Sequence, residues 1–485
     1  MNSRTKQNTP SKNFKSWDFK MNTRTLLTDA AYSLSPGTAT AMNLFVTTGR
    51  GLEPFLLEEI QEIIETFKLP APVAPTAAVA GVALQASFET VVALNMGLTI
   101  ASRVTWTIRE GYAPTAEAAY NLAYNLDWQK LFGVDNSFKV EAHCKDGFTQ
   151  NSMFLALKIK DAIADAFREK TGKRPSVDPK NPDVTVIARL QGKRLTLSID
   201  TSGETLTNHG YRVADGRAPL RENLAAGMVR ATGWCALAKS LRTNCEPVFV
   251  ERAGAKEKPD APRRIAVKIP LLPQFADPMC GSGTLGIEAA LALLNKKPNA
   301  TRSHFAFEAL HCFKGKEFSA IRLRTLKNFE SNTLSTSELL AKISSYIKNI
   351  NSQFPELEFR NAATPIVAGD IDSRAVGATV RNAKAAAVDS LIEAGVASFF
   401  DEEATNRGGI MVLNPPYGER LEDEEAAIKM HEDIGSALKH RYKGWMAWII
   451  SSNAAAIKRI GLRPTRKFAL YNGQLPCQYQ QYILY

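Results

Sequence analysis

The alternation of apolar and polar positions divides the chain into an N-terminal α+β part and a C-terminal α/β part. NLFVTT, residues 43–48, is apolar enough for a strand, and residues 49–67 then carry Leu, Phe and Ile at helical spacings of three and four. The opposite face of this predicted helix is acidic and holds Glu53, Glu58, Glu59, Glu62 and Glu65. Because an acidic face repels polyanions, we expect the helix to pack within the protein.

A basic helix and a hairpin complete the N-terminal pattern. Residues 153–172 predict a helix that ends at Gly172, and residues 183–200 alternate with period two on both sides of Gln191-Gly192, which predicts a hairpin. The helix and the loop after it carry Lys158, Lys160, Arg168, Lys170, Lys173 and Arg174. Such a face can lie against a phosphate backbone or can be a solvated charged face, and the pattern favours neither. Together these elements predict a small α+β module over residues 42–205.

The rest of the chain, residues 206–485, has the pattern of an α/β domain. Residues 219–233 predict a helix with Pro219 in its first turn and Gly233 at its end, and the charged residues 242–268 predict a linker or exposed loop. Beyond residue 270 strand, Gly-rich turn and helix follow one another, which is typical of an open parallel sheet. The polar, helix-forming residues at about 312–360 are interpreted as an insertion.

The first strand end of this domain carries a glycine-rich turn. FADPMCGSGTLGIEAALALL places Asp277 and Pro278, and then Gly281 and Gly283, between a short strand and a helix. Glycines there let a ligand approach the backbone at the N-terminus of a helix. The turn is not a P-loop, because no Gly-Lys-Ser/Thr follows, and it lacks the third glycine of a dinucleotide fingerprint at the usual place.

Two later strand ends carry acidic residues. PIVAGDIDSRAV ends a strand at Asp370, and a carboxylate in that place can accept both hydroxyls of a ribose. The alternative is an N-cap, and we assign Asp370 to the ribose and Asp372 to the cap of the next helix. Asp401, in ASFFDEEA, ends another candidate strand and is a candidate partner for an adenine amine.

The fourth strand, GIMVL, leads into Asn414, Pro415, Pro416 and Tyr417. Two consecutive prolines offer no backbone donors, and each fixes its own φ. The segment therefore holds carbonyl acceptors rigidly beside an aromatic ring, although prolines can also simply end a strand. The ends of strands one, two and four meet at the same edge of a parallel sheet, where ligands bind.

Charge adds a second line of reasoning. The chain of 485 residues has a formal net charge of +11 and a pI of about 9.2, which favours a polyanionic partner, although a generic basic surface gives the same numbers. Part of the excess lies in residues 1–41, which are rich in Ser, Thr, Asn and Lys. We predict a disordered tail there and rank a transit peptide below it.

Composition excludes several classes of protein. The six cysteines form no C-x-x-C pair and the histidines no metal-binding spacing, so we expect no metal and a reducing, cytoplasmic location. No apolar run is long enough to span a membrane. The most apolar stretch, residues 72–84, contains two prolines and is expected to be a loop that enters a strand.

Several sequence motifs follow one another in the order that is typical of one protein family. They are LFVTTGRGLEPFLLEEI, ALNMGLTIASRV, EKTGKRPSVDPKNPDV, LSIDTSGETLTNHGYR, APLRENLAAGM, DPMCGSGTLGIEAAL, NPPY and LRPTRKFALYNGQLPCQ. Over about residues 43–485 the chain resembles the class I S-adenosylmethionine (SAM)-dependent 23S rRNA guanine-N2 methyltransferases with an N-terminal THUMP RNA-binding domain. FAFEAL departs from the family pattern, with Ala306 and Leu310 in place of Gly and Trp.

The resemblance implies a fold, an activity and residue roles. The fold would be a Rossmann-like domain with a mostly parallel sheet and a C-terminal antiparallel hairpin, preceded by a ferredoxin-like plus THUMP module. The methyl donor would be bound by Asp277, Pro278, Cys280, Gly281, Ser282, Gly283, Thr284, Asp370, Asp401 and Asn414. The Asn414 oxygen and the Pro415 carbonyl would accept the two hydrogens of a base amine, in a segment stiffened by Pro416, while Tyr417 stacks on the base.

The same resemblance implies the partner. RNA would be contacted by Lys158, Lys170, Lys173, Arg174, Tyr211 and Arg212. We expect 23S rRNA as substrate and a cytoplasmic monomer. Two alternatives stay open: the same chemistry on a guanine of tRNA, and a THUMP RNA-binding protein that has lost catalysis.

Overall fold

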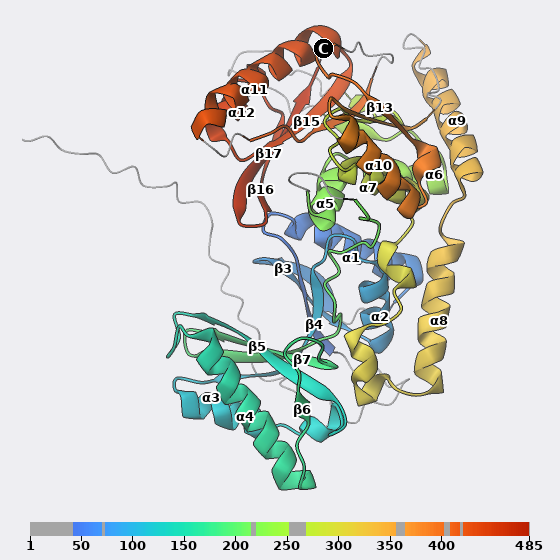
Figure 1. Ribbon diagram of the computed structural model, residues 1–485. Coiled ribbons are helices and arrows are strands. Elements are labelled where there is room, and N and C mark those ends of the chain that lie inside the picture. Colours follow the sequence, from blue (N-terminus) through green and yellow to red (C-terminus); the bar gives the residue numbers. More distant parts are fainter. Residues whose placement is uncertain are drawn as a thin grey trace, which may run out of the picture.

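Two β-sheets, one in each half of the chain, carry the helices of the protein (Figure 1). The computed structural model describes residues 42–69, 73–214, 220–251, 268–355, 364–401, 408–417 and 421–484. The predicted tail, residues 1–41, and most of the predicted linker lie outside these residues. In the described part no helix is both long and apolar enough to cross a membrane.

The N-terminal sheet has eight strands in the order β2-β3-β1-β4-β8-β7-β5-β6. Its strands are β1 (Met42–Thr47), β2 (Val73–Ala78), β3 (Gly81–Ala86), β4 (Arg103–Tyr112), β5 (Ser137–Lys145), β6 (Ser176–Val177), β7 (Val184–Gln191) and β8 (Arg194–Asp200). The predicted β7–β8 hairpin is confirmed, with Gly192 in its turn at φ +58°. Strand β5 pairs in parallel with β6 and β7, and all other neighbours are antiparallel.

The stretch at residues 72–84 is expected to be a loop that enters a strand, but its described residues, 73–84, form most of the β2–β3 hairpin. Pro75 is tolerated because β2 is an edge strand and because the pairing register shifts between Val73 and Thr76.

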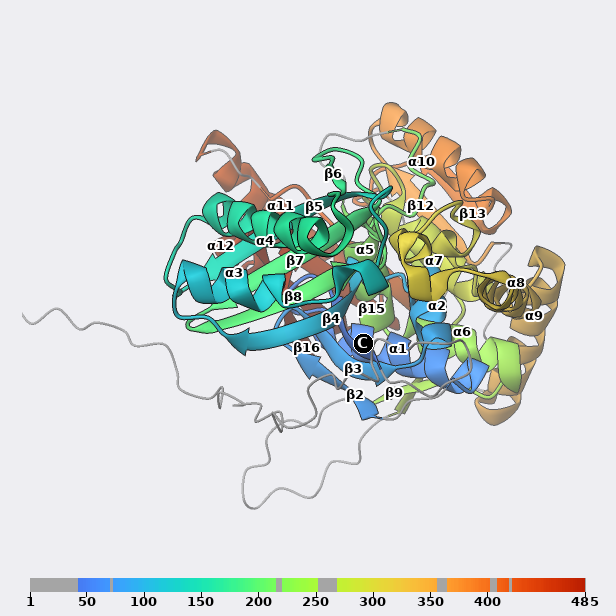
Figure 2. The same ribbon diagram turned by 90° about the horizontal axis from the view of Figure 1, so that it is seen from below.

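Four helices pack against this sheet. They are α1 (Glu53–Phe67), α2 (Phe88–Gly97), α3 (Ala116–Tyr124) and α4 (Ser152–Thr171). Helices α3 and α4 lie side by side, with α4 against β5 and β7 and α3 against β4 (Figures 1 and 2). Helix α4 ends at Gly172 in the left-handed conformation, as predicted. The acidic face of α1 is not wholly solvated: Glu59 is 1% exposed, because it accepts hydrogen bonds from Thr99 and from the Ile100 amide.

The C-terminal sheet has seven strands in the order β13-β12-β11-β14-β15-β17-β16. Its strands are β11 (Phe275–Asp277), β12 (Ile366–Asp370), β13 (Ile392–Val396), β14 (Gly409–Leu413), β15 (Trp445–Ser451), β16 (Arg466–Asn472) and β17 (Leu475–Ile483). The strands from β13 to β15 run parallel, whereas β17 is antiparallel to β15 and forms a hairpin with β16. This arrangement confirms the expected fold class. A separate pair is formed by β9 (Phe249–Glu251) and β10 (Lys268–Pro270).

In the described residues of this half, eight α-helices are present. They are α5 (Glu222–Ala231), α6 (Trp234–Thr243), α7 (Thr284–Leu294), α8 (Lys316–Ser331), α9 (Thr336–Gln353), α10 (Ser373–Ala385), α11 (Leu421–Arg441) and α12 (Ala454–Lys458). Gly233 lies at the break between α5 and α6. The polar segment interpreted as an insertion forms α8 and α9, which run along one side of the molecule (Figure 1). Helix α8 reaches the N-terminal module, where Phe329 packs on Phe67 at 4.7 Å between ring centroids.

Candidate active site at the edge of the C-terminal sheet

The carboxyl ends of three neighbouring parallel strands form the candidate site. Strand β11 ends at Asp277, β12 ends at Asp370, and Asn414 directly follows β14. Because β12, β11 and β14 are adjacent in the sheet, the three predicted residues meet at one edge. Ligands of open α/β sheets bind at such an edge.

The loop after β11 is held against the end of β12. The Gly281 amide donates to Asp370 Oδ2 at 3.0 Å, and the Cys280 amide donates to the Gly369 carbonyl at 2.9 Å. Gly281 and Gly283 have φ of +54° and +81°, a region that other residues rarely adopt. At Gly283 a Cβ would also lie 2.7 Å from the Thr379 side chain. Gly283 therefore lets α10 approach the loop closely.

Asp370 also orders the chain that follows it. Its Oδ1 accepts the Asp372 amide at 2.9 Å, and its side chain is only partly buried. The Asp372 side chain accepts the Arg374 amide, so its predicted role as the N-cap of α10 is confirmed. Asp370 keeps lone pairs beyond these two bonds, so it can still accept from a ligand.

Asp277 has a different environment. It is 1% exposed, and within the described residues neither carboxylate oxygen has a hydrogen bond of good geometry. Burial raises the pKa of Asp277 to about 7; the nearby amides of Gly286 and Met279 oppose the rise, and the charge of Asp370 adds to it. Burial likewise raises the pKa of the Cys280 thiol to about 12, so that thiol stays neutral.

The Asn414–Tyr417 segment is stiff and internally bonded. The Tyr417 hydroxyl donates to Asn414 Oδ1 at 2.6 Å, and the Asn453 side chain donates to the Tyr417 carbonyl at 3.3 Å. Pro415 is buried and Pro416 exposed. Asn453, which also caps α12, was missed by the sequence reasoning. The signal was present, because Asn453 follows the apolar strand β15 as Asn414 follows β14.

Three predicted residues lie elsewhere than expected. Strand β13 ends at Val396, so Asp401 does not end a strand but lies in an exposed turn where its amide donates to the Ser398 carbonyl. Tyr211, predicted to contact RNA, is 3% exposed and donates its hydroxyl to Glu288. Arg212, also predicted to contact RNA, is turned inward and donates to Ser282 and Thr284.

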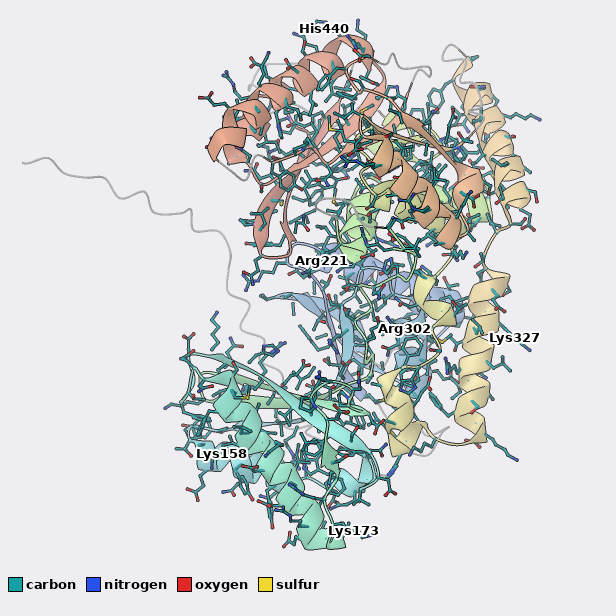
Figure 3. The ribbon with its side chains drawn as sticks, in the orientation of Figure 1. Lys158, Lys173, Arg221, Arg302, Lys327 and His440 are labelled. Atoms are coloured by element: carbon teal, nitrogen blue, oxygen red, sulfur yellow. The ribbon has the colours of Figure 1, made fainter. Side chains whose placement is uncertain are left out.

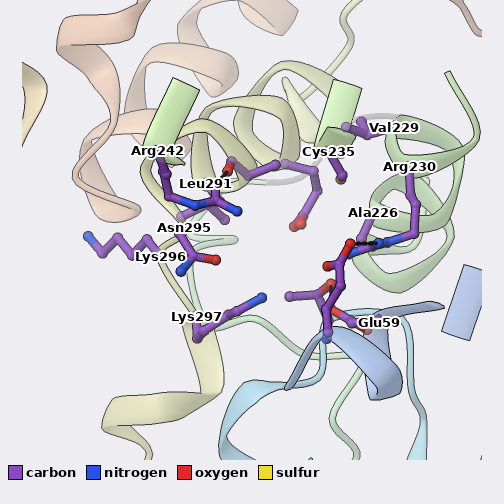
Figure 4. A pocket seen from close by; sticks show the side chains of 14 residues that line it. Glu59, Ala226, Val229, Arg230, Cys235, Arg242, Leu291, Asn295, Lys296 and Lys297 are labelled. Carbon is purple, nitrogen blue, oxygen red and sulfur yellow. Dashed lines mark hydrogen bonds and ion pairs between the residues drawn. The ribbon is translucent and has the colours of Figure 1, made fainter. Parts of the chain in front are cut away.

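A charged pocket lies away from this edge, between α1 and the helices α5, α6 and α7 (Figure 4). Arg230 makes two hydrogen bonds of 2.9 Å to Glu62, which Figure 4 marks with a dashed line. Burial alone would raise the pKa of Glu62, but Arg230 lowers it. Lys297 points into the pocket from the chain after α7 (Figure 4). The ion pair between Arg230 of α5 and Glu62 of α1 joins the two halves of the protein.

Comparisons with known proteins give a match for each half of the chain. Residues 113–200 match the THUMP domain family, and residues 273–481 match the RMKL-like methyltransferase domain family. The chain carries a THUMP domain and an RMKL-like methyltransferase domain. Over 443 residues it is 30% identical to the ribosomal RNA large subunit methyltransferase K/L of Shewanella frigidimarina, and over 444 residues 31% identical to that of Shewanella loihica. These matches cover 91% and 92% of this chain but 53% of each relative, so the chain spans about half their length.

Solved structures support the same fold. A possible methylase from Clostridium difficile 630 aligns with a TM-score of 0.70 and 22% identity, over 92% of this chain and 98% of that one. The structure of SMU.472 complexed with SAH (S-adenosylhomocysteine) aligns with a TM-score of 0.69 and 22% identity, over 92% and 99%. TrmN from Thermus thermophilus aligns with a TM-score of 0.55 and 18% identity, over 91% and 98%. The same fold thus recurs over nearly the whole of each of these solved chains.

The THUMP domain presents most of its predicted RNA contacts to solvent. Lys173 and Arg174 are exposed, and no ion pair of Lys158, Lys173 or Arg174 occurs in the described residues. Figure 3 places Lys158 and Lys173 on the surface of this domain. Lys170 differs, because it pairs with Asp127. Near Lys158 the helix α4 also exposes Met153, Phe154 and Leu157, which the sequence reasoning took only as helix-forming residues.

The described residues contain no group of three or more side chains suited to hold a metal ion.

Proposed function

We propose that this protein transfers a methyl group from SAM to the exocyclic N2 amine of a guanine in 23S rRNA. The observation that carries the proposal is the rigid Asn414–Tyr417 segment at the end of β14, beside the glycine-rich loop after β11. The matched rRNA methyltransferases of Shewanella support this substrate class. We also propose the division of the chain into an RNA-binding module over residues 42–205 and a methyltransferase domain over residues 206–485.

The residues at the strand ends fit the methyl donor. The loop Gly281–Thr284 offers a backbone that a ligand can approach at the N-terminus of α7, and Asp370 keeps acceptor capacity for ribose hydroxyls. The buried Asp277 side chain has no hydrogen bond of good geometry in the described part, and when ionised it would favour a cationic ligand at this edge. When bound, SAM supplies a methyl group on a positively charged sulfur.

The protein's own contribution is to position the base. A guanine amine is a poor nucleophile because its lone pair is delocalised into the ring. Asn414 Oδ1 and the Pro415 carbonyl would accept the two amine hydrogens and so orient the lone pair towards the methyl group, with Tyr417 stacked on the base. Asn414 Oδ1 already accepts the Tyr417 hydroxyl, but an amide oxygen has two lone pairs and can accept a second hydrogen. This mechanism requires no acid–base triad.

The RNA would be bound by the THUMP domain. Lys173 and Arg174 are exposed beyond the end of α4, and Phe154 and Met153 lie on the same helix as apolar surfaces on which bases can stack. Phosphate contacts by such cations give affinity without sequence preference. The choice of nucleotide would then depend on the base pocket around Asn414 and Tyr417.

The test is methyl transfer from labelled SAM to unmodified 23S rRNA and to unmodified tRNA in separate reactions, followed by nucleoside analysis. We expect N2-methylguanosine in 23S rRNA. Label only in tRNA would keep the mechanism and overturn the substrate. If labelled SAM binds but neither RNA is methylated, the target would be a ribosome-assembly intermediate, to be tested next as substrate, or the protein would act only by binding RNA.

A further inference from the structure

The segment that joins the two domains runs directly past the glycine-rich loop. This connecting segment, Thr201–Ala214, follows β8 and is anchored to the N-terminal module, since the Leu206 amide donates to the Ser102 carbonyl at 2.9 Å. His209 then bridges the halves: Nε2 lies 3.1 Å from the Thr99 carbonyl and Nδ1 lies 2.7 Å from Glu288 of α7. The connecting segment is therefore bonded to both halves of the protein before it reaches the glycine-rich loop.

Arg212, the next cation of this segment, reaches into the methyltransferase domain. Its Nη1 donates to Ser282 Oγ at 3.1 Å, and its Nη2 donates to Thr284 Oγ1 at 3.2 Å. The same guanidinium donates to the Leu220 carbonyl at 2.7 Å and to Glu222 at 2.9 Å. With four partners and a side chain only 15% exposed, Arg212 is not presented to an RNA phosphate.

Asn382 of α10 fixes the same place from the other side. Its Oδ1 accepts the amides of Val213 and Ala214 at 3.0 and 2.9 Å. Its Nδ2 donates to the carbonyls of Ala214 and Ser282 at 2.9 and 3.0 Å. Asn382 is 1% exposed, so these bonds are shielded from water. Arg212 and Asn382 thus hold Ser282 by its side chain and its backbone.

We propose that Arg212, supported by Asn382, is a positioning residue that holds the loop Gly281–Thr284 in the shape that binds SAM. The inference rests on the proposed function. The loop needs such support because two of its four residues are glycines, which cost the most entropy to order. A guanidinium suits the task, since its rigid planar fork can fix two hydroxyl groups at once. A hydroxyl that accepts from Arg212 must also turn its own hydrogen towards another acceptor.

The experiment measures SAH binding by calorimetry on the full chain carrying Arg212→Met, Arg212→Lys or no substitution. We expect Arg212→Met to weaken SAH binding by about tenfold, as for the loss of charge-assisted hydrogen bonds, and Arg212→Lys to restore part of it because lysine can reach only one hydroxyl at a time. In the methyl-transfer assay the KM for SAM should rise more than kcat falls. Arg221→Met, a change at the exposed Arg221 labelled in Figure 3, is the matched control and should bind SAH as the unsubstituted chain does.

A second pair of variants protects the test against misfolding. Ser282→Ala with Thr284→Val removes the same two bonds from the loop side, and should weaken SAH binding while adding Arg212→Met weakens it little further. SAH affinity that is unchanged in all of these chains would overturn the inference. Loss of binding to a 23S rRNA transcript with SAH affinity unchanged would also overturn it and make Arg212 an RNA contact. If the unsubstituted chain itself binds neither SAM nor SAH, the proposed function fails instead.

Discussion

Two buried carboxyl groups, Asp277 before α7 and Glu288 within α7, have opposite surroundings. At the strand edge before α7, Asp277 is buried with no hydrogen bond of good geometry among the described residues. Within α7, Glu288 is equally buried but accepts from Tyr211 at 2.7 Å and lies 2.7 Å from His209. A buried polar group normally has partners, and one without them indicates strain or a ligand. The comparison therefore separates the candidate binding site from a joint between domains.

The joint is built from charges that satisfy one another. Glu62 of α1 is held across the joint by Arg230 of α5, and beside it Glu59 accepts three hydrogen bonds from Thr99 and Ile100 of its own module. Burial alone would lower the pKa of His209, but Glu288 outweighs it and raises that pKa. At the candidate binding edge, the Asp277 carboxyl group has no such partner among the described residues. We therefore expect substitutions at the joint to change stability, and substitutions at the edge to change activity or its dependence on pH.

The largest effect on stability is expected from Glu288→Ala. The change leaves His209 and Tyr211 buried without their acceptor, and breaking a buried pair from one side costs about 3–5 kcal/mol. Urea unfolding near neutral pH measures it, with Glu330→Ala on the exposed face of α8 as a control expected within about 0.5 kcal/mol. A loss below about 1 kcal/mol at Glu288 would mean that the joint does not depend on this cluster.

The largest effect on activity is expected from Asn414→Ala. Losing one preorganised acceptor for the substrate amine should lower turnover by about 10²–10³-fold, while RNA binding barely changes. Tyr417→Phe is the matched control: it removes the hydroxyl bond to Asn414 but keeps the ring, so turnover should fall far less. Near-normal turnover of Asn414→Ala would remove Asn414 from the mechanism.

We expect Asp277→Asn to change how the free energy of unfolding depends on pH. The folded protein holds the Asp277 proton up to about pH 7, whereas the ordinary pKa is 3.8. Its contribution to stability is therefore complete at low pH and is lost as pH rises through that window, by at most about 1.4 kcal/mol per pH unit. Asparagine lacks this loss, so the variant should gain stability relative to the unsubstituted chain from about pH 4 up to about pH 7, and no more above it. Parallel urea-unfolding stabilities across that range would show that Asp277 does not titrate there.

Local patterns predicted which residues lie at the strand ends of the candidate site, and pairings far apart in sequence explain what these patterns missed. Glycines, prolines and apolar runs mark strand ends directly, so Asp277, Asp370 and Asn414 were found from their neighbours alone. Arg212 and Glu59 depend instead on partners about 70 and 40 residues away, and a basic or acidic residue type does not reveal that it is buried. The strand expected at ASFF failed for a related reason. An aromatic pair predicts a strand, but here it lies in a turn beside α11, where Phe399 stacks on Tyr442.

The smallest effect is expected at Lys173 and Arg174, which belong neither to the joint nor to the candidate binding edge. Both are exposed and have no ion pair in the described residues. Replacing both Lys173 and Arg174 with Ala should weaken RNA binding and flatten its salt dependence by at most about 1.4 in the log–log slope, at about 0.7 for each lost phosphate contact. Lys316→Ala with Lys327→Ala on α8 removes the same net charge from another exposed surface and is the control. Equal slopes for the two double variants would show that the effect is one of overall charge, and an unchanged slope for the first would move the RNA surface away from the end of α4. A lower slope for the Lys173 and Arg174 variant alone would distinguish these exposed cations from both the joint and the edge. Their loss would weaken the association with RNA and change neither stability nor methyl transfer itself.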